Sequence, residues 1–247
     1  MNGRNSPHEA KLEVVHDAAA LAARVAAWIF ELALATQGRF AICLAGGSTP
    51  RALYEILAGA PYLQHFPWQR THLFWGDERF VPPDDKQSNY RMVREALLRA
   101  VDIPSGNIHA VPTQPNTPDE TCAEYQRTLQ DYYGASSLDP KRPMFDVTLL
   151  GLGPDGHTAS LFPGTAALNE RAAWVTTSLG PQASPRITLT YPTLESSRHV
   201  AFLVEGHGKQ DILARVRAGD AALPASHVRP VGELHIFADT AAGPPVM

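Results

Sequence analysis

The segment MFDVTLLGLG, residues 144–153, most constrains the fold, because it is a largely apolar run that ends in glycines. A strand that is apolar throughout is typical of a parallel sheet covered by helices on both faces. Other strand-like runs alternate with segments of helical spacing along the chain. This alternation predicts a single α/β domain with a mostly parallel, Rossmann-like sheet flanked by helices on both faces.

The expected elements follow from apolar spacing and from turn residues. The predicted strands are 40–44, 71–80, 107–111, 144–153, 172–179, 186–191, 199–206 and 233–239. The predicted helices are 17–37, with Asp17 as N-cap and Gly38 as the stop, 48–59, 89–99, 117–134 and 208–219. Residues 171–204 break the simple alternation, which predicts a small antiparallel excursion.

Composition excludes several classes of protein. The net charge is −4 and lysine and arginine form no dense run, so nucleic acid is not an expected partner. We find no apolar signal core and no stretch of about 18 apolar residues, which predicts no membrane partner. Cys43 and Cys122 are expected to be free thiols, which indicates a reducing compartment and a cytoplasmic location.

The loop AGGSTP, residues 45–50, joins a predicted strand to the start of a helix. Gly46 and Gly47 allow a close approach of the backbone to a ligand, and Ser48 and Thr49 supply hydroxyls. Free N–H groups at a helix N-terminus favour an anion such as phosphate. An ordinary strand–helix turn with a cap is the alternative.

Three charged residues, Asp77, Glu78 and Arg79, follow the next predicted strand. Surface charge clusters usually serve only solvation. In an open parallel sheet, however, ligands bind at the carboxyl ends of the strands. The position therefore favours a role in a ligand cleft shared with residues 45–50.

The glycines of LLGLGPDGHTASLFPG, residues 149–164, have the spacing of a dinucleotide-binding turn. Such a turn must open a helix and be followed about 20 residues later by an acid. Here Pro163 and Gly164 interrupt the helix and no acid follows at that distance. The loop instead displays Asp155 and His157, and histidine exchanges protons near neutral pH. Two metal ligands are too few for a site, so no metal is predicted.

The three loops together resemble the 6-phosphogluconolactonase family, which forms a wider group with glucosamine-6-phosphate isomerase/deaminase. AGGSTP, GDERFVPPDDKQSNY and GLGPDGHTASLFPG occur in the family's order and spacing, and the resemblance runs from about residue 12 to 240. In the deaminases the segment that corresponds to DGHTASLFPG resembles DGHIAFNEPG, with Asn-Glu in the place of Leu161 and Phe162. The deaminases also tend to have tyrosine where this chain has Arg79. Both departures favour the lactonases.

The resemblance implies one domain at 12–240. The polar residues at the start predict a flexible extension at 1–11, and residues 241–247 are expected to be a tail. It implies hydrolysis of 6-phospho-D-glucono-1,5-lactone to 6-phosphogluconate, the second step of the oxidative pentose phosphate pathway, without a metal or organic cofactor. His157 is the expected general base. Arg79 either stabilises the oxyanion or shapes the loop through Asp77, while Asp77 and Asp155 either hold sugar hydroxyls or orient His157.

Two cations complete the expected phosphate site. Arg186 and Lys209 match positions where the superfamily places phosphate-contacting cations, and they join Gly46, Gly47, Ser48 and Thr49. Of the other histidines, His109, His199 and His235 are expected to be packed, and His207 is a weak ligand candidate. An amino-sugar-phosphate deaminase and a non-catalytic sugar-phosphate sensor remain alternatives, and the sequence leaves monomer and homodimer open.

Overall fold

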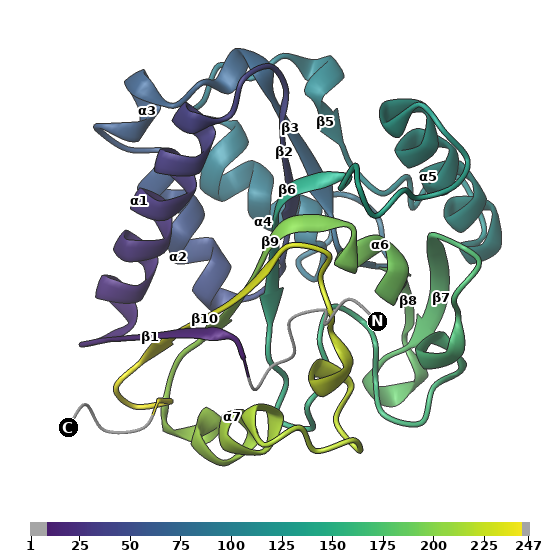
Figure 1. Cartoon of the computed structure of the whole chain (residues 1–247). Helices are drawn as coiled ribbons and strands as arrows, with labels where there is room; N and C mark the ends of the chain where they lie inside the picture. The colour runs from purple at the N-terminus through teal and green to yellow at the C-terminus, as the bar shows by residue number, and fades with distance from the viewer. Residues whose placement is uncertain (1–8, 244–247) are drawn as a thin grey trace.

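The computed structural model describes residues 9–243, and its main feature is a seven-stranded parallel sheet (Figure 1). Across the sheet the strand order is β1, β10, β9, β6, β2, β3, β5. In that order the strands are Lys11–Val15, Glu233–Asp239, Ser197–Val204, Phe145–Gly151, Phe40–Leu44, Thr71–Trp75 and Ile108–His109. The predicted α/β class with a mostly parallel sheet is confirmed.

A second, antiparallel sheet explains why residues 171–204 break the alternation. Its strand order is β4 (Asp77–Arg79), β8 (Pro185–Leu189) and β7 (Val175–Leu179). The expected antiparallel excursion is therefore confirmed. The small sheet also contains β4, which lies outside residues 171–204 and carries the candidate site residues Asp77 and Arg79.

Helices cover both faces of the large sheet (Figure 1). Helices α1 (Ala18–Ala35) and α2 (Ser48–Leu57) pack against each other on one face, and α5 (Pro118–Tyr133) packs against the small sheet on the other. The other helices are α3 (Tyr62–His65), α4 (Asn89–Val93), α6 (Tyr191–Glu195) and α7 (Gln210–Arg217). Short 3-10 helices span Trp68–Arg70, Ser105–Asn107, Ala166–Asn169, Pro181–Ala183, His207–Lys209 and Pro224–His227, and a π-helical turn spans Arg94–Leu98.

Helix α1 corrects one expectation from the sequence. By length and composition it is apolar enough to cross a membrane, although we expected no such stretch. Its apolar character has another use here, because Leu21, Val25 and Ile29 are fully buried against the sheet and α2. Asp17 caps its start, as predicted, by accepting a hydrogen bond from the Ala20 N–H.

The predicted strand at 71–80 divides at Gly76 into β3 and β4. The Gly76 N–H donates to the Leu44 carbonyl of the large sheet, and the Leu189 N–H of the small sheet donates to the Gly76 carbonyl. Gly76 thus joins the two sheets, and the chain changes direction there. The charged residues after it consequently lie on a separate strand, where the two sheets meet.

Other boundaries also differ from the sequence prediction. The helix expected at 89–99 is α4 followed by the π-helical turn, in which the Arg99 N–H donates to the Arg94 carbonyl. The strand expected at 186–191 stops at Leu189, because Tyr191 already begins α6. Strand β1 and helices α3 and α6 were not expected.

Strand β1 lies at the edge of the large sheet and pairs with the last strand, β10, from Lys11 opposite His235 to Val15 opposite Asp239. The Thr240 hydroxyl also donates to the His16 carbonyl at 2.7 Å. The predicted boundary of the flexible extension, residue 11, is therefore too far along the chain, because Lys11 is already the first residue of β1. Residues 1–8 of that extension and 244–247 of the expected tail lie outside the described residues.

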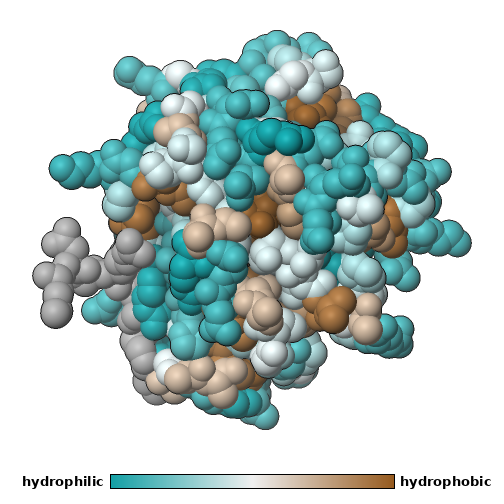
Figure 2. Space-filling model, turned by 90° about the vertical axis from the view of Figure 1, so that its right-hand side faces the viewer, coloured by the Kyte–Doolittle hydropathy of each residue, from teal (hydrophilic) through white to brown (hydrophobic). Residues whose placement is uncertain are grey.

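The surface seen from the right-hand side of Figure 1 is mostly hydrophilic, with small and separate apolar patches (Figure 2). Among the described residues, Leu34 and Leu179 are the exposed large apolar side chains. Cys43 is buried, Cys122 is half-buried, and both are free thiols, as expected.

Candidate active site

The three loops selected from the sequence line one cavity of about 340 Å³. The cavity lies where β2, β3, β6 and β9 end, which is the expected location in a parallel sheet. Its lining includes Gly46, Gly47, Ser48, Thr49, Asp77, Arg79, His157 and Lys209. Two expected site residues, Asp155 and Arg186, are not in that lining.

The loop after β6 is built around the His157 ring. No helix opens there; the next helical residues are Ala166–Asn169. A Cβ atom added to Gly153 would lie 2.7 Å from His157 Cγ and closer still to Nδ1 and Cε1. Glycine is therefore needed at 153 so that the imidazole can pack onto its own loop. Gly153 thus makes room for the histidine, which agrees with the rejection of a dinucleotide-binding turn.

Asp155 lies behind the imidazole. Its Oδ1 is 2.5 Å from His157 Nδ1 and also accepts the His157 backbone N–H at 3.2 Å. Partial burial acts to raise the pKa of Asp155, but hydrogen bonds from the ring and backbone of His157 bring it below its ordinary value. With Nδ1 engaged, Nε2 is the nitrogen left for proton transfer, and Phe162 packs against the ring at 4.4 Å between centroids.

Asp77 is held by neutral donors from two other segments. Its Oδ2 accepts the Ser160 hydroxyl at 2.6 Å, and Asn89 Nδ2 lies 3.0 Å from its backbone carbonyl. Among the ion pairs of the described residues there is none between Asp77 and Arg79. Arg79 Nη1 instead donates to the Gln87 carbonyl at 2.7 Å. The alternative in which Arg79 shapes the loop through an ion pair with Asp77 is therefore wrong, and Arg79 contacts the loop through Gln87.

Two arginines lie opposite each other on the small sheet. Arg79 of β4 pairs in register with Arg186 of β8, and the Nε atoms of both are buried without a hydrogen-bond partner. Burial first and the neighbouring Arg79 charge second lower the pKa of Arg186. Unpartnered buried donors of like charge are costly, so this pair is suited to an anion.

Another part of the cavity lining is the start of α2 together with Lys209. Gly47 is the N-cap and makes no side-chain cap hydrogen bond, so the first N–H groups of the helix are not capped by a side chain. Ser48 Oγ lies 3.4 Å from a Glu205 carboxylate oxygen, and Lys209 Nζ donates to the Leu152 carbonyl at 2.7 Å. A cation and a helix N-terminus thus face the cavity, with one acid beside them.

Comparison with known proteins agrees with this geometry. The family model for glucosamine-6-phosphate isomerases/6-phosphogluconolactonase matches residues 16–236. The chain belongs to this family. It is 45% identical to a 6-phosphogluconolactonase of Nostoc sp. over 238 residues, which covers 94% of this chain and 96% of the relative.

Solved structures of the family share the fold. The 6-phosphogluconolactonase of Thermotoga maritima superposes with a TM-score of 0.79 at 32% identity, covering 93% of this chain and 99% of that one. A monomeric glucosamine-6-phosphate deaminase gives a TM-score of 0.77 at 21% identity, covering 94% of this chain and 98% of that one. The second likeness concerns the fold alone.

Three residues near the site were not selected from the sequence as ligands or supports: Asn89, Ser160 and Glu205. A Cβ at Gly46 would lie 2.7 Å from Asn89 Nδ2, so glycine at 46 makes room for this amide. Asn89 is the second-last residue of the segment GDERFVPPDDKQSNY, and its place in that motif was the available signal. Ser160 likewise lies in the quoted motif GLGPDGHTASLFPG. Glu205 had no comparable signal, because its contact with Ser48 is made across the fold.

Glu78 is a buried carboxylate that holds two segments of the site together. It is 2% exposed and accepts the backbone N–H groups of Arg79, Asn89 and Tyr90 and the Ser88 hydroxyl. Burial raises its pKa, and the three backbone hydrogen bonds act against that rise. Glu78 thus joins β4 to the start of α4 rather than facing a ligand.

Within residues 9–243, no histidine other than His157 lines this cavity. His72 and His109 form a pair with ring nitrogens 3.1 Å apart, and His199 and His235 form a second pair. His207, the weak ligand candidate, is not in the lining of the cavity.

Proposed function

We propose that this chain hydrolyses 6-phospho-D-glucono-1,5-lactone to 6-phosphogluconate. The observation that carries the proposal is a single cavity with a carboxylate-backed imidazole on one wall and a helix N-terminus with Lys209 on another. The names of the Nostoc and Thermotoga maritima relatives support the same substrate. Hydrolysis of an ester needs a base for water, and a phosphorylated substrate needs a cationic anchor.

In the proposed reaction, His157 Nε2 takes a proton from water as the water oxygen bonds to C1. The imidazolium then returns the proton to the ring oxygen as the C1–O bond breaks. Asp155 holds the ring through Nδ1 and stabilises the imidazolium. Proton transfer of this kind contributes typically 10²–10⁴-fold to the rate.

Arg79 and the phosphate site act on the two ends of the substrate. Arg79, with a buried unpartnered Nε, stabilises the negative charge that develops on the carbonyl oxygen. Asp77, fixed by Ser160, accepts a sugar hydroxyl. The α2 N-terminus and Lys209 bind the phosphate, which positions C1 for attack. Arg186 lies beside Arg79 but is not in the cavity lining. It binds the phosphate only if the substrate extends beyond that lining.

His157→Ala tests the mechanism. We expect kcat to fall at least about 100-fold, the low end of the general-base range, while 6-phosphogluconate still binds. His207→Ala is the matched control, because this histidine lies outside the cavity lining. Unchanged turnover in His157→Ala would remove the imidazole from the reaction.

The deaminase alternative is tested with the same preparation. Leu161 is fully buried and Phe162 packs on the His157 ring. Apolar side chains therefore stand at the two positions that are Asn-Glu in the deaminase motif. We expect acid release from fresh lactone and no ammonia release from glucosamine 6-phosphate. Ammonia release without lactonase activity would reverse the assignment.

A further inference from the structure

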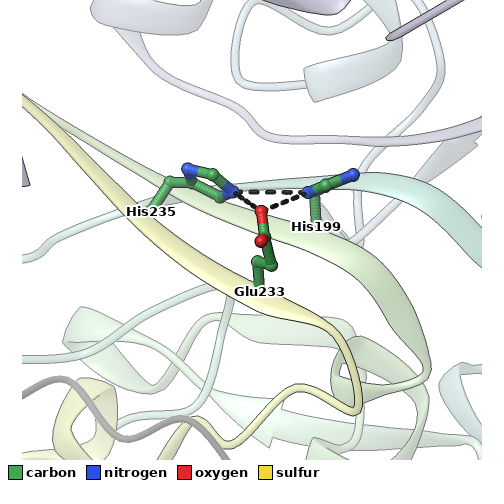
Figure 3. Close-up of side chains that lie close together, drawn as sticks. All are labelled: His199, Glu233 and His235. Carbon is green, nitrogen blue, oxygen red and sulfur yellow. Dashed lines mark hydrogen bonds and ion pairs between the residues drawn. The ribbon is translucent and has the colours of Figure 1, made fainter. Parts of the chain in front are cut away.

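Two histidines and one glutamate meet on the large sheet, away from the cavity (Figure 3). Glu233 and His235 are two residues apart on β10, so their side chains lie on the same face of the strand. His199 of β9 is the register partner of Glu233. These residues are near the amino ends of β9 and β10, whereas the candidate active site is at the carboxyl ends of the strands.

The three facing atoms form an almost equilateral triangle. His199 Nδ1 and His235 Nε2 are 3.3 Å apart, and Glu233 Oε2 lies 3.4 Å from the first and 3.3 Å from the second. In a tetrahedral zinc site with bonds of about 2.0–2.2 Å, neighbouring ligand atoms are separated by roughly 3.3–3.6 Å. The three separations therefore match those along one face of such a tetrahedron.

Neighbouring side chains hold this arrangement in place. Lys11 Nζ binds the other carboxylate oxygen of Glu233 at 2.6 Å, so Oε2 is left facing the histidines. The Trp28 ring packs against His199 at 5.7 Å and His235 at 4.8 Å between centroids. Outer contacts of this kind orient metal ligands.

We propose that His199, Glu233 and His235 bind a divalent transition-metal ion of the zinc class, with water as the fourth ligand. Neutral imidazole and carboxylate are ligands that zinc accepts, and three protein ligands leave one position open. A cavity of about 290 Å³, whose lining includes Lys11, Arg24, Trp28 and His235, lies beside the cluster. The sequence does not reveal this cluster, because His199 and His235 are 36 residues apart and come together only through the pairing of β9 with β10.

The test uses the full chain after metal removal, titrated with Zn²⁺ and measured by calorimetry and by elemental analysis. We expect one Zn²⁺ per chain at this site, and at least about 100-fold weaker binding in His199→Ala and in His235→Ala. His109→Ala is the matched control, because the His72–His109 pair has a similar nitrogen separation but forms no ion pair among the described residues. It should bind like the unmodified protein.

Two measurements keep the proposal open to refutation if a variant fails to fold. X-ray absorption of the zinc-loaded unmodified protein should show two imidazoles and four N/O ligands at about 2.0–2.1 Å. Co²⁺ in place of Zn²⁺ should give the visible bands of tetrahedral coordination. Absence of a stoichiometric ion would overturn the proposal and leave a hydrogen-bonded His–His–Glu cluster. Zinc retained by both histidine variants but lost in His157→Ala would overturn it in favour of the candidate active site.

Discussion

Replacement of Gly153 by alanine isolates the role of the loop that holds His157. The added Cβ would lie 2.7 Å from His157 Cγ, whereas an ordinary contact is 3.4 Å or longer. The imidazole must therefore shift by at least about 0.7 Å, and by more at Nδ1, which is closer. A misplacement of about 1 Å in a reacting group costs roughly 10²-fold in rate.

We accordingly expect Gly153→Ala to lower kcat for the lactone about 100-fold, which corresponds to about 2.7 kcal/mol in the activation barrier. The assay measures acid release from freshly prepared lactone, with KM and kcat determined separately. Thermal unfolding of the same sample checks that the fold is kept. Binding of 6-phosphogluconate should change much less than kcat, because the proposed phosphate site, at the start of α2 and Lys209, does not include the loop around Gly153.

Gly151→Ala is the control within the same loop. A Cβ at this position meets no atom within 4 Å, so the imidazole keeps its place and kcat should stay within about threefold of the unmodified protein. Gly151 lines the cavity, so a change confined to KM leaves the reasoning intact. The argument fails if Gly153→Ala retains full kcat, or if both variants lose it equally.

Three other changes address the rest of the molecule. Lys209→Met removes a cation from the cavity wall and should raise KM at least about tenfold with little change in kcat; an unaltered KM would place the phosphate elsewhere. Glu78→Gln deprives buried N–H donors of their carboxylate and should lower the free energy of unfolding by about 2–4 kcal/mol in denaturant titration. The control, Glu55→Gln at an exposed position, should lower it by less than about 0.5 kcal/mol. Equal losses in the two variants would contradict this reasoning. Burial, and then the charges of His72 and Arg39, lower the pKa of His109 to about 4. The unfolded state therefore takes up its proton first as the pH falls below about 6.5, and stability is lost between about pH 6.5 and 4. Allowing for solvent screening, this loss is about 1–2 kcal/mol. His109→Gln should flatten that part of the stability profile, and an identical profile would refute the assignment.

Local signals in the sequence predicted the elements whose ends are determined by neighbouring residues. Helix α5 begins with the Thr117–Glu120 capping box and ends at Gly134 in the left-handed conformation, close to the predicted bounds. The division at Gly76 was not predictable in this way. Its N–H and carbonyl bond to strands more than 30 and more than 100 residues away, and only the assembled sheets reveal that.

The candidate site shows the same division. The ends of parallel strands meet at one edge, so the loops that carry Ser48, Asp77 and His157 were expected to converge, and they do. The contact between Ser160 and Asp77 spans 83 residues and depends on how the two sheets pack. Periodicity carries no information about such a contact. The same holds for the cluster of His199, Glu233 and His235, which depends on register.

The pairing of β1 with β10 determines when this enzyme can be completed during its synthesis. The first strand, Lys11–Val15, finds its partner only after Asp239 has left the ribosome. At about 5–20 residues per second, the nascent chain carries an unpaired first strand for roughly 10–45 s. Leu12 and Val14 stay without their strand partners, Ile236 and Ala238, for that time. A circular permutant that begins after β1 and carries this strand behind β10 would remove the delay.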